Sequence, residues 1–593
     1  MPTNKLLILV LGTCVFLSLA GCQSWSLSSR KAHAAAPVKN VPPPPHVAGT
    51  VAEYCRLVGG SDLLVQGYAL VVGLGKNGCS ELPPVVRDYM LNVLSRHDIG
   101  SWVKDMQGVT PGQVLRDLDT AVVLVAGRIP PGSPKGASFD LFVSALPQTT
   151  TKSLDGGILL PAELHLALGG VATPGGPSKI LAEGGGAIFI NPFADPTNAA
   201  DTQKFRTGRV PGGGRVKEPR GITLQLMERD YARADAIQKR INARFSPPSG
   251  KNVANAINQG NSIAINIPPA QRDDYVHFLR LVTHLPLRSG PGEWEQHARD
   301  IGSAMELPTA QHEELALVWE AMGRQVLPVI QPYYLSRNAP TAFWSAVAGV
   351  RLGDDTAADV VIRMATTGGS PQQAPAIKEL GRNRAILRAA PILRKLLDER
   401  NELVRVAAYE ALVARRDTTA ITSIEIGKHP IKDERTKDSD VQFVLDLVAS
   451  HESPVIYATQ SGQPRIALFG KDMQVSRPLF FCAPDDMVTL NANTAQSKLT
   501  VFRKIPRTGT SSGSFQIDSY VRTLVQTLGS MVDPDKNGQI QGLGVNYSQV
   551  LAVLQRLCQR GDVPARFVLQ QPPGVRDMYQ DVMSTGRPDM PGS

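Results

Sequence analysis

Three glycines early in the chain fit a spacing that binds dinucleotides in other proteins. Gly73, Gly75 and Gly78 follow an apolar, strand-like run and match the pattern G-x-G-x-x-G. A dinucleotide site needs a helix that opens directly after the glycines, so that its N-terminus meets the pyrophosphate. Here Pro83 and Pro84 intervene before the next helical pattern. We therefore interpret the motif as a glycine turn and predict no bound cofactor.

The segment from Asp533 to Gly544 begins like the calcium-binding loop of an EF-hand. Asp535, Asn537 and Gly538 stand at the spacing that such a loop requires after its first aspartate. The twelfth position, where a bidentate glutamate completes the calcium shell, is Gly544. We interpret the segment as an Asp/Asn-Gly turn that leads to a helix, and we predict no metal there.

Histidines and glutamates gather in two places. His312-Glu313-Glu314 starts like the zinc motif H-E-x-x-H, but the second histidine is missing. His277 and His284 lie seven residues apart on a predicted helix and could share a face, although paired core or surface histidines are commoner than a two-ligand metal site. Nothing in the sequence combines a nucleophile, a base and an orienting group. The prediction is a protein without catalytic residues, metal or cofactor, and not an enzyme.

The N-terminus has the layout of an export signal. Lys5 precedes an apolar run over residues 6–16, which is shorter than a membrane span, and small residues follow. The run ends in Leu-Ala-Gly before Cys22, which resembles the bacterial lipobox, and Gln23 after the cysteine favours the outer membrane. The alternative is ordinary signal cleavage beside an unrelated cysteine. We predict a lipid on Cys22.

Four further cysteines remain beyond Cys22 once the signal is removed. Cys55 and Cys79 flank a strand-like segment, and an oxidising compartment permits a disulfide between them. They could equally be buried free thiols. No CxxC pair is present, so no zinc site is expected.

Composition limits the partners of the chain. Of 593 residues, 42% are hydrophobic and 19% are charged, which is enough for several packed domains. The net charge is +9, but the basic residues are spread out and only 6% of residues are aromatic. Nucleic acid is therefore not an expected partner, whereas peptidoglycan or lipid headgroups suit a mildly basic surface.

The first half of the chain alternates strands with amphipathic helices. Strands are predicted at 63–74, 121–129, 138–146, 157–168, 186–190, 221–227 and 261–267, and helices at 84–96, 230–245 and 272–284. Phe139, Leu141, Val143 and Ala145 alternate with polar residues, as in a half-buried strand. This pattern predicts an α+β region with several antiparallel hairpins.

Several of these segments, in the same order, resemble the flagellar P-ring protein family. The segments are LLVQGYALVVGL (63–74), VVLVAGRIPPGSPKGASFDLFVSAL (122–146), TKSLDGGILLPAEL (151–164), GRVPGGGRV (208–216), ITLQLMERDYARADAIQKRINARF (222–245) and the stretch NSIAINIPP…FLRLVTHLPL (261–287). The resemblance implies a periplasmic ring of identical subunits around the flagellar rod, without catalytic residues. A lipid anchor and more than 300 further residues are departures from the family.

Residues 291–440 show helical periods throughout. The stretch 374–414 resembles a HEAT repeat, with predicted helices at 390–397 and 402–413, and 346–365 suggests an earlier copy. Stacked helix pairs of this kind bury a continuous core and often bind protein. A plain helical domain without a binding role is the alternative.

The sequence therefore predicts a multidomain α+β protein with a mixed antiparallel N-terminal half, a HEAT-like helical middle and a small α+β C-terminal domain. The predicted divisions are a signal peptide (1–21), a lipidated tether (22–48), a P-ring-like region (49–290), a helical region (291–440), a C-terminal domain (441–570) and a flexible tail (571–593). The expected function is a ring or ring support in the flagellar basal body, with copies of itself, rod and L-ring proteins as partners. The alternative is a lipid-anchored periplasmic adaptor that docks another envelope complex through its helices.

Overall fold

The computed structural model consists of two units, Met1–Pro43 and Pro44–Ser593, and the second contains every element discussed below. The structure describes residues 43–96, 108–147, 149–167, 179–195, 198–247, 250, 252–258, 261–272, 274–288, 290, 292–428, 441–470, 472–483, 487–493, 498–504, 511–530 and 542–571. The predicted signal peptide, Cys22, most of the tether and the calcium-like segment after Asp533 lie outside these residues. No helix of the described part is long and apolar enough to cross a bilayer.

Six antiparallel strands close into a barrel in the order β2-β3-β4-β7-β6-β5. Their bounds are β2 (Leu63–Val72), β3 (Thr120–Ile129), β4 (Ser138–Ala145), β5 (Ile158–Leu166), β6 (Ala182–Ala187) and β7 (Thr207–Val216). The alternation predicted in β4 is observed, with Phe139, Leu141 and Val143 buried in the barrel core. The strand expected at 186–190 lies earlier, as β6 (Ala182–Ala187), and Phe189 adds only an isolated bridge to Arg209 of β7.

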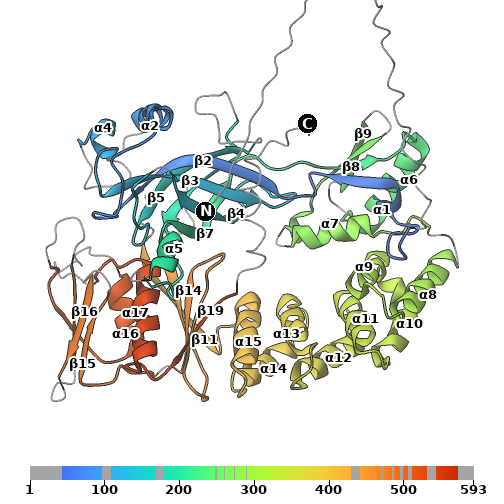
Figure 1. Cartoon of the computed structure of the whole chain (residues 1–593). Coiled ribbons are helices and arrows are strands. Elements are labelled where there is room, and N and C mark those ends of the chain that lie inside the picture. Colours follow the sequence, from blue (N-terminus) through green and yellow to red (C-terminus); the bar gives the residue numbers. More distant parts are fainter. Residues whose placement is uncertain are drawn as a thin grey trace, which may run out of the picture. The chain divides into compact units, whose positions relative to one another are not determined.

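The outer face of β2 is covered as well as its inner face. Helices α2 (Pro84–Arg96) and α4 (Pro111–Val114) lie beside the barrel in Figure 1. Met90 and Leu94 of α2 pack with Leu70 and Val72 of β2 in a second core outside the barrel. Burial on both faces explains why β2 reads as a nearly continuous apolar run rather than as an alternating one.

A four-stranded antiparallel sheet follows, in the order β1-β8-β10-β9. Its elements are α1 (Val51–Tyr54), β1 (Cys55–Val58), β8 (Ile222–Leu226), α6 (Tyr231–Phe245), β9 (Ala254–Asn258), β10 (Ser262–Ile265), η3 (Pro269–Gln271) and α7 (Tyr275–Thr283). Asp230 caps α6 by accepting a hydrogen bond from the amide of Arg233. Ile237 and Ile241 of α6 are buried, as an amphipathic helix requires, and they share a core with Phe278 of α7.

The next region is helical over its whole length. It comprises α8 (Glu293–Met305), α9 (His312–Met322), η4 (Arg324–Val326), α10 (Leu327–Ile330), η5 (Gln331–Leu335), α11 (Ala339–Arg351), α12 (Asp355–Thr366), α13 (Gln373–Arg382), α14 (Ala389–Leu396) and α15 (Glu402–Arg415). Neighbouring helices pack in sequence order along one core. Gly381 lets α13 approach α15, since a Cβ there would lie 2.6 Å from the Cα of Ala411.

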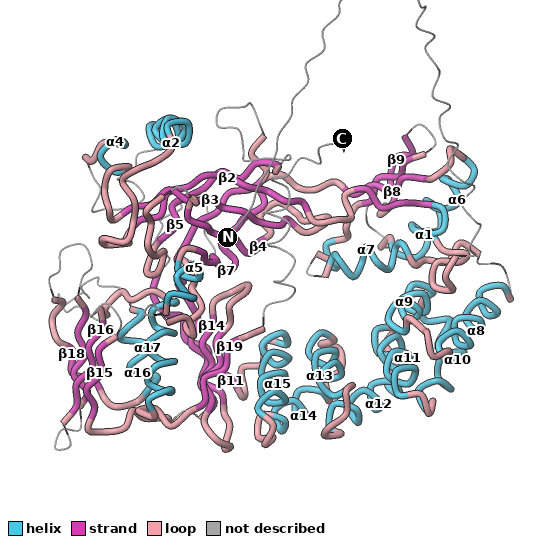
Figure 2. The backbone as a smooth tube through the Cα atoms, in the orientation of Figure 1, coloured by secondary structure: helices cyan, strands magenta, loops and turns pink. Residues whose placement is uncertain are grey.

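The C-terminal domain places two helices between two sheets (Figure 2). One sheet has the order β11-β12-β14-β13-β19, with β11 (Ile421–Lys428), β12 (Val441–Val448), β13 (Val455–Ala458), β14 (Arg465–Phe469) and β19 (Arg566–Leu569). The other contains β15 (Leu479–Cys482), β16 (Val488–Ala492), β17 (Leu499–Arg503) and β18 (Phe515–Ile517). Helices α16 (Val521–Gly529) and α17 (Tyr547–Arg560) fill the space between them.

Two features of this domain differ from the sequence-based expectation. Strand β11 lies inside the range for which helices were expected, and β12 and β13 were not predicted. Strands β16 and β17 form a hairpin, paired from Val488–Arg503 to Asn491–Thr500. The mixed α+β multidomain class itself is confirmed, with antiparallel sheets in the first half and helices in the middle.

Candidate functional site

No group of three or more histidine, cysteine, aspartate or glutamate side chains is arranged to hold a metal ion among the described residues. Gly75 donates its amide to Asp119 Oδ1 at 2.6 Å, so the glycine motif closes a turn against the start of β3. Helix α2 begins only at Pro84, well after that turn.

Cys55 and Cys79 are both buried free thiols in the structure rather than a disulfide. Cys55 belongs to the core beneath the four-stranded sheet, and burial raises its pKa to about 11. Cys79 lies beside the barrel, where its thiol donates to the carbonyl of Glu81 at 3.0 Å and accepts from Thr150. The two cysteines therefore lie in different parts of the fold.

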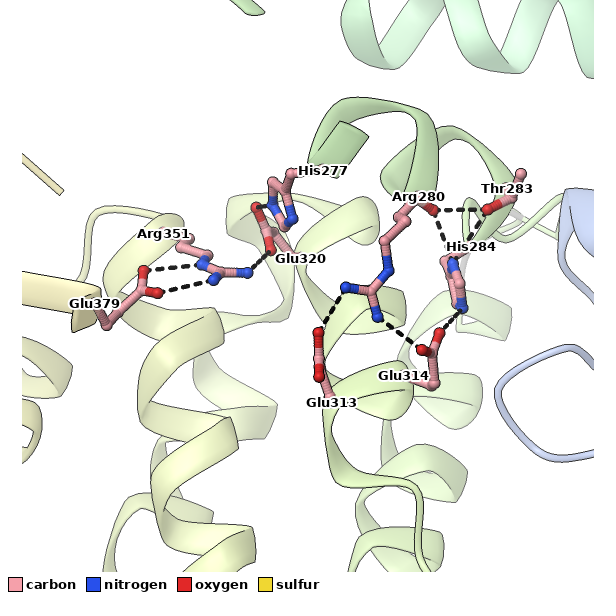
Figure 3. A network of polar contacts seen from close by, with 9 residues as sticks. All are labelled: His277, Arg280, Thr283, His284, Glu313, Glu314, Glu320, Arg351 and Glu379. Atoms are coloured by element: carbon pink, nitrogen blue, oxygen red, sulfur yellow. Dashed lines mark hydrogen bonds and ion pairs between the residues drawn. The ribbon is translucent and has the colours of Figure 1, made fainter. Parts of the chain in front are cut away.

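The two histidines and the glutamates of the His312 motif meet at one place, which we call the helical junction. It is formed by the side chains of His277, Arg280, His284, Glu313, Glu314, Glu320, Arg351 and Glu379 (Figure 3). Helix α7 and its C-cap contribute His277, Arg280 and His284. Helix α9 contributes the three carboxylates of Glu313, Glu314 and Glu320. Four of these side chains stood out in the sequence, namely His277, His284, Glu313 and Glu314. The sequence did not predict that they contact one another.

The inner half of the helical junction is a buried chain of charges. His277 Nε2 lies 2.7 Å from Glu320 Oε1, and Arg351 Nη1 lies 3.2 Å from the other oxygen of Glu320. Arg351 also binds Glu379 through two hydrogen bonds, of 2.9 and 2.8 Å. Burial alone would raise the pKa of Glu320, but His277 and Arg351 outweigh it and lower the pKa. Glu320 is therefore held as a carboxylate.

The outer half of the helical junction is more open to solvent. Arg280 contacts Glu313 and Glu314 at 2.5 and 2.6 Å, and these side chains are all about one third or more exposed. His284 Nε2 lies 2.8 Å from Glu314 Oε2, while its Nδ1 lies 2.7 Å from the carbonyl oxygen of Arg280. The ring of His46 stacks on that of His284, with centroids 6.1 Å apart.

Apolar packing accompanies the ionic contacts because α9 belongs to two cores. Its residues Leu317 and Ala321 pack with α6 and α7, whereas Val318 and Trp319 pack with the helical region. Arg244 of α6 donates to the carbonyl oxygens of Glu320 and Ala321 at the end of α9. An arginine at a helix C-terminus pairs with carbonyls that have no partner within the helix. The helical junction is thus continuous with both cores.

A second contact, which we call the barrel junction, joins the barrel to the C-terminal domain. It consists of Asp140 of β4, Arg209 and Gly212 of β7, and Gln460, Ser461 and Gly462 in the turn between β13 and β14. A register shift in β7 opposite Asp140 creates a bulge, and Gly212 has φ +60° there. The glycines quoted in the sequence therefore shape a strand irregularity rather than a free loop.

Asp140 is the centre of the barrel junction. Its Oδ1 accepts hydrogen bonds from the amides of Gly212 and Gly462 at 2.7 and 2.9 Å, and its Oδ2 accepts from Ser461 Oγ at 2.5 Å. Arg209 Nη1 lies 3.8 Å from the same carboxylate and donates to the carbonyl of Gln460. Most partners are thus neutral N–H and O–H groups, and two belong to the backbone.

Apolar contacts extend the barrel junction along the loop after β6. Phe189 of this loop belongs to the core of the C-terminal domain and lies with its ring centroid 6.2 Å from that of Tyr547. The amide of Ile190 donates to Ser548 Oγ at 3.0 Å. Ile188 and Ile190, on either side of Phe189, are buried in the barrel core, so the apolar residues after β6 are buried from two sides.

In the comparison with known proteins, a single family match covers both the barrel and the four-stranded sheet. Residues 51–293 match the family model described as flagellar P-ring protein. This region is similar to the flagellar P-ring protein family. The match begins at the first residue of α1 and ends at the first residue of α8, so both junctions join the P-ring region to residues outside it. The resemblance inferred from the ordered segments is confirmed.

Relatives of the same description span several bacteria. The flagellar P-ring protein of Anaeromyxobacter dehalogenans (strain 2CP-C) is 28% identical over 262 residues, which are 43% of this chain and 62% of that protein. That of Nitratidesulfovibrio vulgaris is 30% identical over 236 residues, 38% of this chain and 57% of the relative. That of Geobacter sulfurreducens is 26% identical over 315 residues, 50% of this chain and 77% of the relative. The chain thus spans about three fifths of the length of the first two.

Proposed function

We propose that the chain is a non-catalytic structural component of the bacterial flagellar basal body that forms or supports a periplasmic ring around the rod. The observation that carries this proposal is the family match over residues 51–293. Within that range the barrel has an apolar core of its own, and the sheet with α6 and α7 has a second core to which Leu317 and Ala321 of α9 are added. A ring subunit needs such a rigid body, because every copy must present the same two surfaces to its neighbours.

The proposed partners are further copies of the chain, the rod and L-ring proteins, and peptidoglycan. The proposed location is the periplasm, with a lipid on Cys22 that anchors the protein to the outer membrane. The sequence around Cys22 and the Pro-rich stretch after it support this arrangement. The helical and C-terminal regions would then be additions that brace the P-ring region through the two junctions.

Electron microscopy of the full chain, extracted from cells in mild detergent, tests the proposal. We expect annular particles, and we expect cells that lack the protein to lose motility until the full chain is restored. A strictly monomeric protein, together with normal swimming of cells that lack it, would contradict the ring.

The second candidate is a lipid-anchored adaptor that docks another envelope complex through its helical region. Three leucines of that region, Leu335, Leu387 and Leu403, are 76%, 81% and 66% exposed. Exposed apolar side chains of this size mark contact sites when they gather in a patch. Retention of an envelope protein by the full chain, lost when these leucines are replaced by serine, would favour this function.

A further inference from the structure

A fully buried arginine, Arg405, lies near the start of α15. The side chain of Arg405 is only 1% exposed, and within the described residues it makes no ion pair. Its Nη1 donates to the carbonyl oxygen of Ser453 at 2.8 Å, and its guanidinium lies 5.8 Å from the ring centroid of Phe469. Its Nε has no hydrogen-bond partner among the described residues. A buried charge without a counter-ion is costly, and an anion bound beside it would offset that cost.

Arg405 lines a cavity of about 530 Å³ where α15 meets the sheet edge at β13 and β19. Two more arginines line it, Arg400 just before the helix and Arg566 at the start of β19. The single carboxylate in the lining is that of Glu402, which is 3.1 Å from Arg566. Three guanidinium groups against one carboxylate leave a net charge of +2 in the lining.

The backbone around the cavity adds to its positive potential. Helix α15 has fourteen residues and begins at Glu402, so its N-terminal end faces the same space. Helix N-termini attract anions through unpaired amides and the helix dipole. Asn401 already accepts from the amide of Leu403, and Ser453 offers a hydroxyl in the lining. Arginine forks match the paired oxygens of carboxylates and phosphates.

We propose that this cavity, lined by Arg400, Arg405 and Arg566, is a binding site for an oxyanion, namely a phosphate or a carboxylate group. Arg405 supplies the buried charge, while the exposed Arg400 and Arg566 supply guanidinium groups at the solvent side of the cavity. The site lies outside the P-ring region and does not depend on the ring function.

Calorimetry and thermal unfolding of the full chain test the site with inorganic phosphate and with malonate as probes. Sodium chloride at equal ionic strength is the reference for general salt effects. We expect a probe to bind and to raise the melting temperature, as any ligand of the folded state does. A larger effect of phosphate identifies a phosphate site, and a larger effect of malonate identifies a carboxylate site.

Two variants and a matched control decide the outcome. Arg405→Gln should abolish binding, and Arg400→Gln should weaken it about tenfold, as expected for one charge-assisted hydrogen bond. Arg337→Gln removes another exposed arginine, which is not part of the cavity lining, and should leave binding unchanged. Because Arg400 is exposed, its variant remains informative if Arg405→Gln fails to fold. The proposal is overturned if neither probe exceeds chloride, or if Arg400→Gln and Arg337→Gln bind alike.

Discussion

The helical junction attaches the P-ring region to the helical region, and the barrel junction attaches it to the C-terminal domain. The two junctions depend on different kinds of contact. At the helical junction two carboxylates, Glu320 and Glu379, are nearly buried and are matched by charged partners. At the barrel junction one carboxylate, Asp140, is matched mainly by neutral donors. The first contact depends on charges within a core, whereas the second depends on the backbone shape of two turns.

This difference implies different consequences of opening. Helix α9 is shared between two cores, so separation at the helical junction exposes Leu317 and Ala321 as well as breaking ion pairs. Separation at the barrel junction removes Phe189 from the core of the C-terminal domain and breaks the contact between Ser461 and Asp140. The core inside the barrel stays intact. We infer that the helical junction is the permanent attachment and the barrel junction the adjustable one. Four predictions test that comparison.

The largest effect is expected from Glu320→Gln. The change leaves His277 and Arg351 facing a neutral amide in a buried place, and breaking a buried pair of this kind costs about 3–5 kcal/mol. Amide hydrogen exchange in α7 and α9 should accelerate accordingly. The control is Glu313→Gln, which removes an exposed ion pair worth less than about 1 kcal/mol. Equal effects of the two variants would show that the buried charges are not what holds the helical junction.

A smaller effect is expected from Asp140→Ala. The variant removes the acceptor of two amides and one hydroxyl, at a cost of about 2 kcal/mol. Hydrogen exchange at Gly462 and in the neighbouring turn should accelerate, while exchange within β2 and β3 stays slow. Asp140→Asn keeps one acceptor oxygen and should give an intermediate result. Unchanged exchange at Gly462 in Asp140→Ala would contradict the assignment of Asp140 as the centre of the barrel junction.

The pH dependence of the two junctions should also differ. Burial lowers the pKa of His284, against the opposing influence of its hydrogen bond to the Arg280 carbonyl and of Glu314. At a pH between the folded and the unfolded pKa, His284 is protonated in the unfolded chain but neutral in the folded one. The free energy of unfolding is therefore highest above about pH 6.5, and it decreases as the pH falls from there toward the folded pKa. One histidine changes the free energy of unfolding by at most about 1.4 kcal/mol per pH unit.

Hydrogen exchange in α7 between pH 7 and pH 5 measures this dependence. His284→Gln should reduce the slope by up to one proton, whereas His451→Gln, whose side chain is 91% exposed, should not change it. The turn at Ser461 should show no such slope in either variant. A slope in α7 that is unaffected by His284→Gln would assign the titration to another group.

Much of the fold could be predicted from local patterns. The alternation in β4, the continuous apolar run of β2 and the stripe of α6 each matched an element within a few residues. Such elements are set by which faces are buried, and periodicity reports that directly. The strand β11 was not predicted because Ile421, Ile424 and Ile426 do not keep a strict alternation and lie within a range where helical periods had dominated.

The junctions could be predicted only in part, because they join residues far apart in the sequence. His277, His284, Glu313 and Glu314 stood out by type, but only the packing of α7 on α9 reveals that they pair. One overlooked signal was Glu320, a lone carboxylate inside the buried apolar run of α9. Asp140 gave no signal, since an aspartate on the polar side of a half-buried strand is ordinary.

The smallest effect is expected from Gly462→Ala, which isolates the backbone contribution to the barrel junction. Gly462 has φ +71°, and a Cβ there meets no atom within 4 Å, so the cost is conformational rather than steric. An alanine in this left-handed region costs about 1–2 kcal/mol. Gly513→Ala is the matched control, because Gly513 is equally unobstructed but does not have a positive φ. Faster exchange of the turn in Gly462→Ala alone would show that its shape presents the amide to Asp140. If both variants exchange alike, the side chain of Ser461 carries the contact, and the barrel junction is less dependent on backbone shape than we infer.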